Sequence, residues 1–121
     1  MMKDMSYASG TLGEVRAEQY LAAQGFEILA HNYRIPGAEI DLIARKADLL
    51  AFVEVKLRKR GAAYGRFSVT QDKQRRISRA ALDYMAKNGF MHLQARFDVL
   101  EIQGTMVTHI PDAFPYQGPM F

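Results

Sequence analysis

The 121-residue sequence predicts one α/β domain, spanning residues 1–121, in which helices flank a mixed central sheet. Three observations support this fold class. Hydrophobic residues make up 49% of the chain, which is enough for a single compact core. Two segments have the periodicity of amphipathic helices, and five shorter segments have the composition or alternation of strands. Their order along the chain is helix, three strands, helix and two strands.

A first helix is expected from residue 12 to about residue 24. The segment Thr11-Leu12-Gly13-Glu14 matches a capping box, and Gly25 is typical of the position after a helix end. On a helical wheel Glu14 falls within the apolar arc, where an acidic side chain needs a partner. Two interpretations of Glu14 stay open: it caps its own helix, or it serves as an outer ligand of a metal site.

Residues 26–33 form the first expected strand. Residues 38–45 and 49–56 follow as the two strands of an antiparallel hairpin, with Ala47-Asp48 as its turn. This turn lacks the glycine of a favoured two-residue turn, so the register of the hairpin could slip by one pair.

Acidic side chains are expected to face each other across this hairpin. The predicted register pairs Lys46 with Leu49. Asp41 then lies directly opposite Glu54. Carboxylates that face each other across two strands repel and destabilise a sheet, whereas a divalent cation between them reverses the sign of the interaction. We therefore predict a Mg²⁺ or Mn²⁺ site at this position.

The spacing of Asp41, Glu54 and Lys56 predicts a site for metal-dependent phosphodiester hydrolysis. Asp41, Glu54 and the Val55 carbonyl would hold the metal ion, and water and phosphate would complete its coordination. A bound divalent ion lowers the pKa of the attacking water and neutralises developing charge. Lys56 shares a strand face with Glu54, so its ammonium is expected to orient the water or stabilise the pentacoordinate phosphorus. The alternative for these residues is a salt-bridge ladder on the surface.

Basic residues cluster next to the acidic hairpin. Nine of the sixteen lysines and arginines lie between residues 56 and 79, although the net charge is only +3. Such clustering predicts a polyanionic partner, with nucleic acid as the first candidate, and the alternative is a solvated basic face. The predicted nucleic-acid-binding residues are Arg58, Lys59, Arg60, Arg66, Lys73 and Arg76.

A second helix is expected to begin at a capping box, Ser68-Val69-Thr70-Gln71, and to run to Lys87 before Asn88-Gly89. Lys73 falls in its first turn, where a basic side chain gains nothing from the helix dipole. That placement is easier to understand if Lys73 faces a phosphate, together with Arg76 and Arg79 in the same half of the helix. Gln71, Lys73 and Gln74 in the first turn are also candidates for pointing at the acidic face of the hairpin.

Two further strands are expected at residues 96–102 and 106–110. Asp98 is an acid within an apolar strand, and we interpret it as a structural partner for a basic residue. The apolar, proline-rich tail, residues 111–121, should pack on the body of the protein or on a neighbouring subunit.

Composition disfavours other classes of protein. No apolar run reaches the length of a membrane span, and the first residues do not resemble a secretory signal. The chain has no cysteine, which excludes disulfides and zinc-thiolate sites. We therefore expect a cytoplasmic protein with no membrane partner.

Several short motifs occur in an order and spacing that are highly specific for one family. They are Gly13-Glu14 with Ala17, Asn32-Tyr33-Arg34, Glu39-Ile40-Asp41-Leu42-Ile43, Phe52-Val53-Glu54-Val55-Lys56 with Arg58, Lys73, Ala81, Arg96-Phe97-Asp98 and Ala113-Phe114. In these motifs the sequence resembles the YraN family of bacterial proteins, which is related to the PD-(D/E)XK nuclease superfamily and, within it, to archaeal Holliday-junction resolvases. Ala38 replaces the usual glycine of the family, and Ile40 replaces the proline of the superfamily signature.

The resemblance implies a restriction-endonuclease-like α-β-β-β-α-β core in a single nuclease-like domain. It also implies that Asp41, Glu54 and Lys56 form the nuclease signature, with Glu14 as a fourth acid. The expected function is a Mg²⁺-dependent endonuclease acting on DNA, and the resolvase kinship suggests branched or structured DNA. Branched DNA presents two strands to be cut, so a homodimer would suit it. The alternatives are a nucleic-acid-binding module without catalysis and a protein-interaction scaffold that uses the apolar tail.

Overall fold

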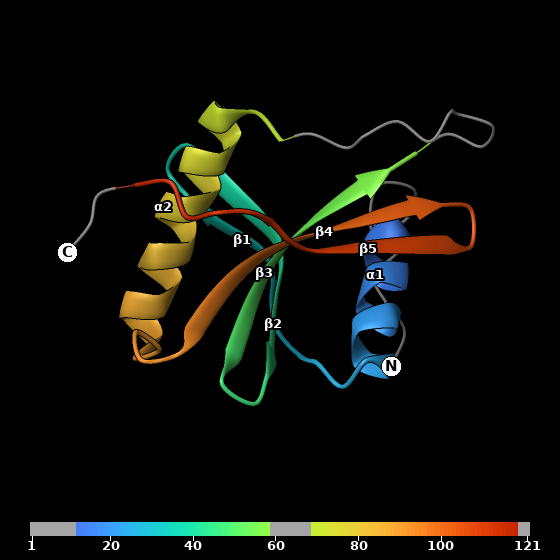
Figure 1. The fold of residues 1–121 in the computed structure, drawn as a ribbon, viewed down its shortest axis with the longest axis horizontal. Helices are drawn as coiled ribbons and strands as arrows, with labels where there is room; N and C mark the ends of the chain where they lie inside the picture. The colour runs from blue at the N-terminus through green and yellow to red at the C-terminus, as the bar shows by residue number, and fades with distance from the viewer. Residues whose placement is uncertain (1–11, 59–68, 119–121) are drawn as a thin grey trace.

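The computed structural model describes residues 12–58 and 69–118. Its elements, in chain order, are α1 (Leu12–Ala23), β1 (Glu27–Ile35), β2 (Ala38–Lys46), β3 (Leu49–Leu57), α2 (Gln71–Asn88), β4 (Gln94–Gln103) and β5 (Met106–Phe114). This order agrees with the expected α-β-β-β-α-β core followed by the fifth strand that the sequence also predicts (Figure 1).

The five strands form one mixed sheet in the order β1-β2-β3-β4-β5. Neighbouring strands pair antiparallel, except that β3 and β4 pair parallel. A parallel pair needs a long crossover connection, and α2 lies within the connection between β3 and β4. The predicted fold class, a mixed sheet flanked by helices, is therefore confirmed.

The two helices cover opposite faces of the sheet (Figure 1). Leu42 and Val53 pack in the cluster beneath α1, whereas their strand neighbours Ile43 and Phe52 pack beneath α2. Successive strand residues point to opposite faces, so β2 and β3 need apolar residues at consecutive positions. Among the described residues, neither helix combines the length and the apolar content needed to cross a membrane.

The hairpin formed by β2 and β3 has the predicted register. Lys46 pairs with Leu49, and the ladder continues to Leu42 and Val53. The turn forms without glycine because Ala47 adopts the left-handed conformation, with φ of 53°. That conformation costs a non-glycine residue about 1–2 kcal/mol, which the paired apolar strands on either side offset.

Helix α2 begins later than the sequence indicated. Thr70, and not Ser68, is the N-cap, and its side chain accepts a hydrogen bond from the Lys73 backbone N–H at 3.1 Å. The expected end is confirmed, because Gly89 caps the helix with φ of 70° and donates its N–H to the Met85 carbonyl. This Thr70 cap fixes Lys73 in the first turn, where the helix meets the sheet.

Strand β5 is longer than predicted and includes the start of the tail. Pro111 lies within it, which is possible because β5 is an edge strand and the missing N–H is not needed for pairing. Phe114 ends the strand and stacks on Phe97, with ring centroids 5.1 Å apart. Gln117 then donates its backbone N–H to the Ser78 hydroxyl at 2.9 Å. The tail therefore packs on the body as far as residue 118, and the remaining residues lie outside the described ranges.

Asp98 in β4 has the structural role that was expected. Its fully buried carboxylate accepts two hydrogen bonds from the Arg96 guanidinium, at 2.8 and 2.7 Å. The Asp112 backbone N–H donates to it at 3.0 Å, and His109 Nε2 lies 2.9 Å away. Burial opposes ionisation of Asp98, but these hydrogen bonds outweigh it and hold the pKa below its ordinary value.

Candidate functional site

The candidate site lies where β2 and β3 diverge. Their ladder ends at Leu42 and Val53, so Asp41 is the first residue of β2 beyond it. Asp41 Oδ2 accepts a hydrogen bond from the Val55 backbone N–H at 2.8 Å. A carboxylate thus occupies a position that a backbone carbonyl takes in a regular ladder, and the strands separate at this point.

The pairing of β1 with β2 is also irregular next to Asp41. Asn32 has φ of 54°, and the pairing of β1 with β2 omits Asn32 and Asp41 between its flanking pairs. Ile40 packs in the cluster beneath α2 and Leu42 in the cluster beneath α1, although regular alternation would point both to one face. The pleat is therefore interrupted at Asp41, which is what aims its side chain out of the ladder.

Asp41 and Glu54 line one pocket, together with residues of α2. The pocket has a volume of about 220 Å³. Its lining residues are Ala38, Glu39, Asp41, Glu54, Lys73, Arg76 and Ile77. The predicted proximity of Asp41 and Glu54 is confirmed by this shared lining, although the paired ladder ends at Leu42 and Val53 and does not include the two acids.

The two acids interact strongly. Burial and the negative charge of Glu54 raise the pKa of Asp41 to about 7, and the charge of Glu14 adds to the effect. The Val55 N–H and the Lys73 ammonium oppose this rise without cancelling it. The surroundings of Asp41 therefore disfavour its carboxylate form unless a cation lies nearby.

A lysine of α2, Lys73, neutralises the charge of Glu54. Only 8% of Glu54 is exposed, and its Oε2 forms an ion pair with Lys73 Nζ. The Lys73 side chain is 41% exposed, so its stem reaches the acid from the pocket rim. The expectation that Lys73 points at the acidic face of the hairpin is confirmed. It also explains a basic residue in the first turn of a helix.

Lys56 lies elsewhere. It is exposed and is not among the residues that line the pocket, although it follows Glu54 on the same strand. In the parallel ladder it lies in register with Glu101 of β4. The ammonium group next to Glu54 thus comes from Lys73, and the catalytic role of Lys56 stays a prediction.

Glu14 approaches the site from α1. Asn32 Nδ2 donates to its Oε1 at 3.5 Å, and burial raises its pKa. The helix comes close to the sheet here because Gly13 has no Cβ, and a Cβ at that position would overlap the Leu57 side chain. Glu14 affects the charge state of Asp41 but does not line the pocket. Its role as an outer ligand stays a prediction.

The predicted basic residues fall into three groups. Lys73 and Arg76 line the pocket, and Arg76 also bonds Asp72 at 3.1 Å. Arg58 pairs with Glu101 at 2.9 Å and is partly buried. The third group, Lys59, Arg60 and Arg66, lies outside the described residues.

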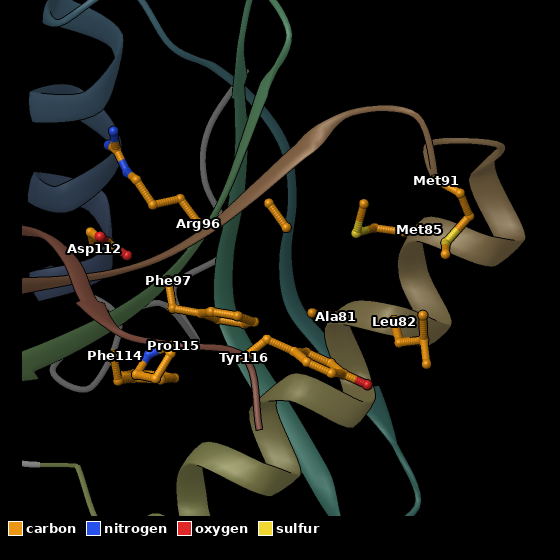
Figure 2. Close-up of a pocket in the computed structure, with 11 residues that line it drawn as sticks. Ala81, Leu82, Met85, Met91, Arg96, Phe97, Asp112, Phe114, Pro115 and Tyr116 are labelled. Carbon is orange, nitrogen blue, oxygen red and sulfur yellow. The ribbon is translucent and has the colours of Figure 1, made fainter. Parts of the chain in front are cut away.

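A larger pocket of about 380 Å³ lies beside α2, β4 and β5. Figure 2 shows Phe97, Phe114 and Tyr116 on one side of it and Met85 and Met91 on the other. None of the predicted site residues lines it. Its lining is mostly apolar, and its charged members are Arg96, which is bonded to Asp98, and a single carboxylate, Asp112. The pocket that contains Asp41 and Glu54 brings two carboxylates together and is therefore the better candidate for catalysis.

A family model and the similar proteins both assign the chain to the same family. The model of the family described as "Uncharacterised protein family UPF0102" matches residues 13–102. A UPF0102 protein of Desulfosudis oleivorans is 50% identical over 97 residues, covering 78% of each chain. One of Trichlorobacter lovleyi is 44% identical over 115 residues, covering 88% of this chain and 90% of the relative. The resemblance to YraN proteins is confirmed at the level of the family, and the chain belongs to UPF0102.

Proposed function

We propose that this protein is a metal-dependent endonuclease that hydrolyses phosphodiester bonds in DNA. The observation that supports it most is the pocket in which Asp41 and Glu54 lie together with two basic residues of α2. Acidic oxygens for a metal ion and basic groups for a phosphate are the two components that phosphoryl hydrolysis needs in one place.

The donor set fits a hard divalent cation. Mg²⁺ prefers carboxylate oxygens from one or two residues and keeps water or substrate phosphate in its other positions. Among residues 12–58 and 69–118, no three acidic or histidine side chains form a metal cluster, so Asp41 and Glu54 would be the carboxylate ligands. The Val55 carbonyl is the third proposed ligand. Bound there, Mg²⁺ or Mn²⁺ would lower the pKa of the attacking water and neutralise charge on the phosphate.

Residues of the chain itself prepare this site. The Val55 N–H fixes the orientation of the Asp41 carboxylate through a bond of 2.8 Å. Lys73 and Arg76 line the pocket, and in this proposal their side chains bind phosphate oxygens of the DNA. Ile77 is buried in the wall of the pocket and excludes water, which strengthens each of these electrostatic interactions.

Branched or structured DNA is the proposed substrate class. It rests on the kinship of the YraN family with the PD-(D/E)XK superfamily and the archaeal Holliday-junction resolvases. Two strands must be cut in a branched substrate, so a homodimer with two such pockets is part of the proposal.

A cleavage assay tests the proposal. Labelled duplex and four-way-junction DNA would be incubated with the protein and Mg²⁺ or Mn²⁺. Asp41→Asn and Glu54→Gln should each abolish cleavage, whereas Asp48→Asn, in the exposed hairpin turn, should leave it intact. Cleavage that persists in both acid variants, or no cleavage of either DNA with either metal, would refute the assignment.

The second candidate is a nucleic-acid-binding module without catalysis. The ion pair between Glu54 and Lys73 favours it, because this pair satisfies the acid without a metal ion. Such a module would bind DNA with an affinity that falls steeply with salt and would cleave it with no metal. Neutralising Arg58, Lys59 and Arg60 should weaken that binding.

A further inference from the structure

We infer that Lys73 is a resident cation of the acidic pocket, which a divalent metal ion displaces from Glu54 and which then binds the phosphate of the nucleic acid. This inference rests on the proposed function and deepens it. It assigns to one side chain of α2 the coupling between metal binding and DNA binding.

The distribution of charge around the pocket supports this role. Arg76 bonds Asp72 on its own helix, and Glu39 pairs with Arg34 at 3.2 Å. These contacts turn two of the charged lining residues toward partners outside the inner pair of acids. Among the described lining residues, Lys73 is the one whose ion pair is made with Glu54.

The same position cannot hold both cations. A metal ion coordinated by the Glu54 carboxylate would lie within a few ångströms of an ammonium bonded to Oε2 of the same group, and like charges at that distance repel. A divalent ion also attracts both acids with twice the charge of an ammonium. Lys73 should therefore leave Glu54 when the metal ion binds.

Displacement is easy for this side chain. Lys73 is anchored at its backbone by the Thr70 cap, while its side chain is 41% exposed on a flexible four-carbon stem. The freed ammonium remains at the rim of the pocket, where a phosphate held by the metal ion would lie. Coupling of this kind is reciprocal: DNA that attracts Lys73 also strengthens metal binding.

Metal binding without DNA tests the inference. Binding of Mn²⁺ alone would be measured by isothermal titration calorimetry for the wild type, Lys73→Met and Arg76→Met. Methionine keeps an apolar stem and removes the charge. Arg76 provides the matched control, because it lines the same pocket from the same helix but bonds Asp72. We expect Lys73→Met to bind Mn²⁺ about tenfold more tightly than the wild type, and Arg76→Met to change by less than about threefold.

A second variant controls for an effect of local misfolding on Mn²⁺ binding. Lys73→Gln keeps a polar side chain, and it should also bind Mn²⁺ more tightly. Equal or weaker Mn²⁺ binding in both Lys73 variants would overturn the inference, as would an equal gain in Arg76→Met.

The outcome separates this inference from the endonuclease proposal. Tighter Mn²⁺ binding by the Lys73 variants, with no cleavage of DNA by the wild type, would retain the displacement of Lys73 and remove the enzymatic function. Unchanged Mn²⁺ affinity, with cleavage that depends on Asp41, would do the opposite.

Discussion

Replacing Asp41 with asparagine should stabilise the metal-free protein, and the gain should grow with pH. Asp41 is disfavoured as a carboxylate because it is desolvated and lies near Glu54, which together raise its pKa to about 7. Asparagine is nearly isosteric and carries no charge. Its side-chain oxygen can still accept the hydrogen bond from the Val55 N–H.

The magnitude follows from the difference in pKa between the folded and the unfolded chain. The folded-state pKa lies above the ordinary value of 3.8, so the contribution of Asp41 to stability is fully present below about pH 4 and is lost as the pH rises through about 7. At about 1.4 kcal/mol per pKa unit, the carboxyl group costs the fold about 4 kcal/mol at pH 8 and less than half of that at pH 5. The advantage of Asp41→Asn should therefore widen by about 2–3 kcal/mol over this interval.

Urea unfolding at pH 5 and pH 8, with a chelator present, measures this difference. Asp48→Asn is the matched control, because it makes the same chemical change in the exposed turn of the same hairpin. If Asp41→Asn is no more stable than the wild type at pH 8, or if its advantage is the same at both pH values, the electrostatic account of the site is wrong.

Three further predictions concern the stability of the fold. Asp98→Asn should cost about 3 kcal/mol in urea unfolding at pH 7, because the partly buried Arg96 loses its counter-charge. Since the pKa of Asp98 is lowered, this deficit should shrink as the pH falls below about 4. Thr70→Ala should cost about 1 kcal/mol by removing the N-cap that positions Lys73, measured by the same assay against Thr108→Ala. Gly89→Ala should lower the free energy of unfolding by about 1 kcal/mol, because alanine is strained at the positive φ of this position. No atom lies within 4 Å of a Cβ built there, so an unchanged urea midpoint would contradict this strain.

The hairpin was predictable because its information is local. Alternation of apolar residues sets which side chains share a face, and the length of the turn sets the register. These two facts place Asp41 across from Glu54 without knowledge of any other element. The predicted register is confirmed although Ala47 is a poor turn residue, since the apolar pairs on both strands favour one register. The ladder itself stops one residue before Asp41 and Glu54.

The partner of Glu54 was not predictable in the same way. Alternation along one strand gives Lys56 the same face as Glu54, whereas the pairing depends on how a helix crosses the sheet. Lys73 is 19 residues further along the chain, and the crossover that brings it back includes residues outside the described ranges. Alternation along a strand shows which side chains share a face of the sheet, but it does not show which helix residue contacts that face. The irregularity at Asn32 is similarly invisible, because asparagine tolerates positive φ without requiring it.

The ion pair of Lys73 with Glu54 also bears on which cations the pocket can accept. The fold brings together two acids that repel, and it relieves the repulsion with one positive charge from its own chain. A monovalent metal ion that replaced this ammonium would supply no additional charge and would lose the covalent tether that holds Lys73 nearby. A divalent ion would supply one more charge and satisfy both acids at once. If the pocket binds a metal ion as proposed, the ion pair of Lys73 with Glu54 should favour divalent over monovalent ions, independently of any preference in coordination geometry.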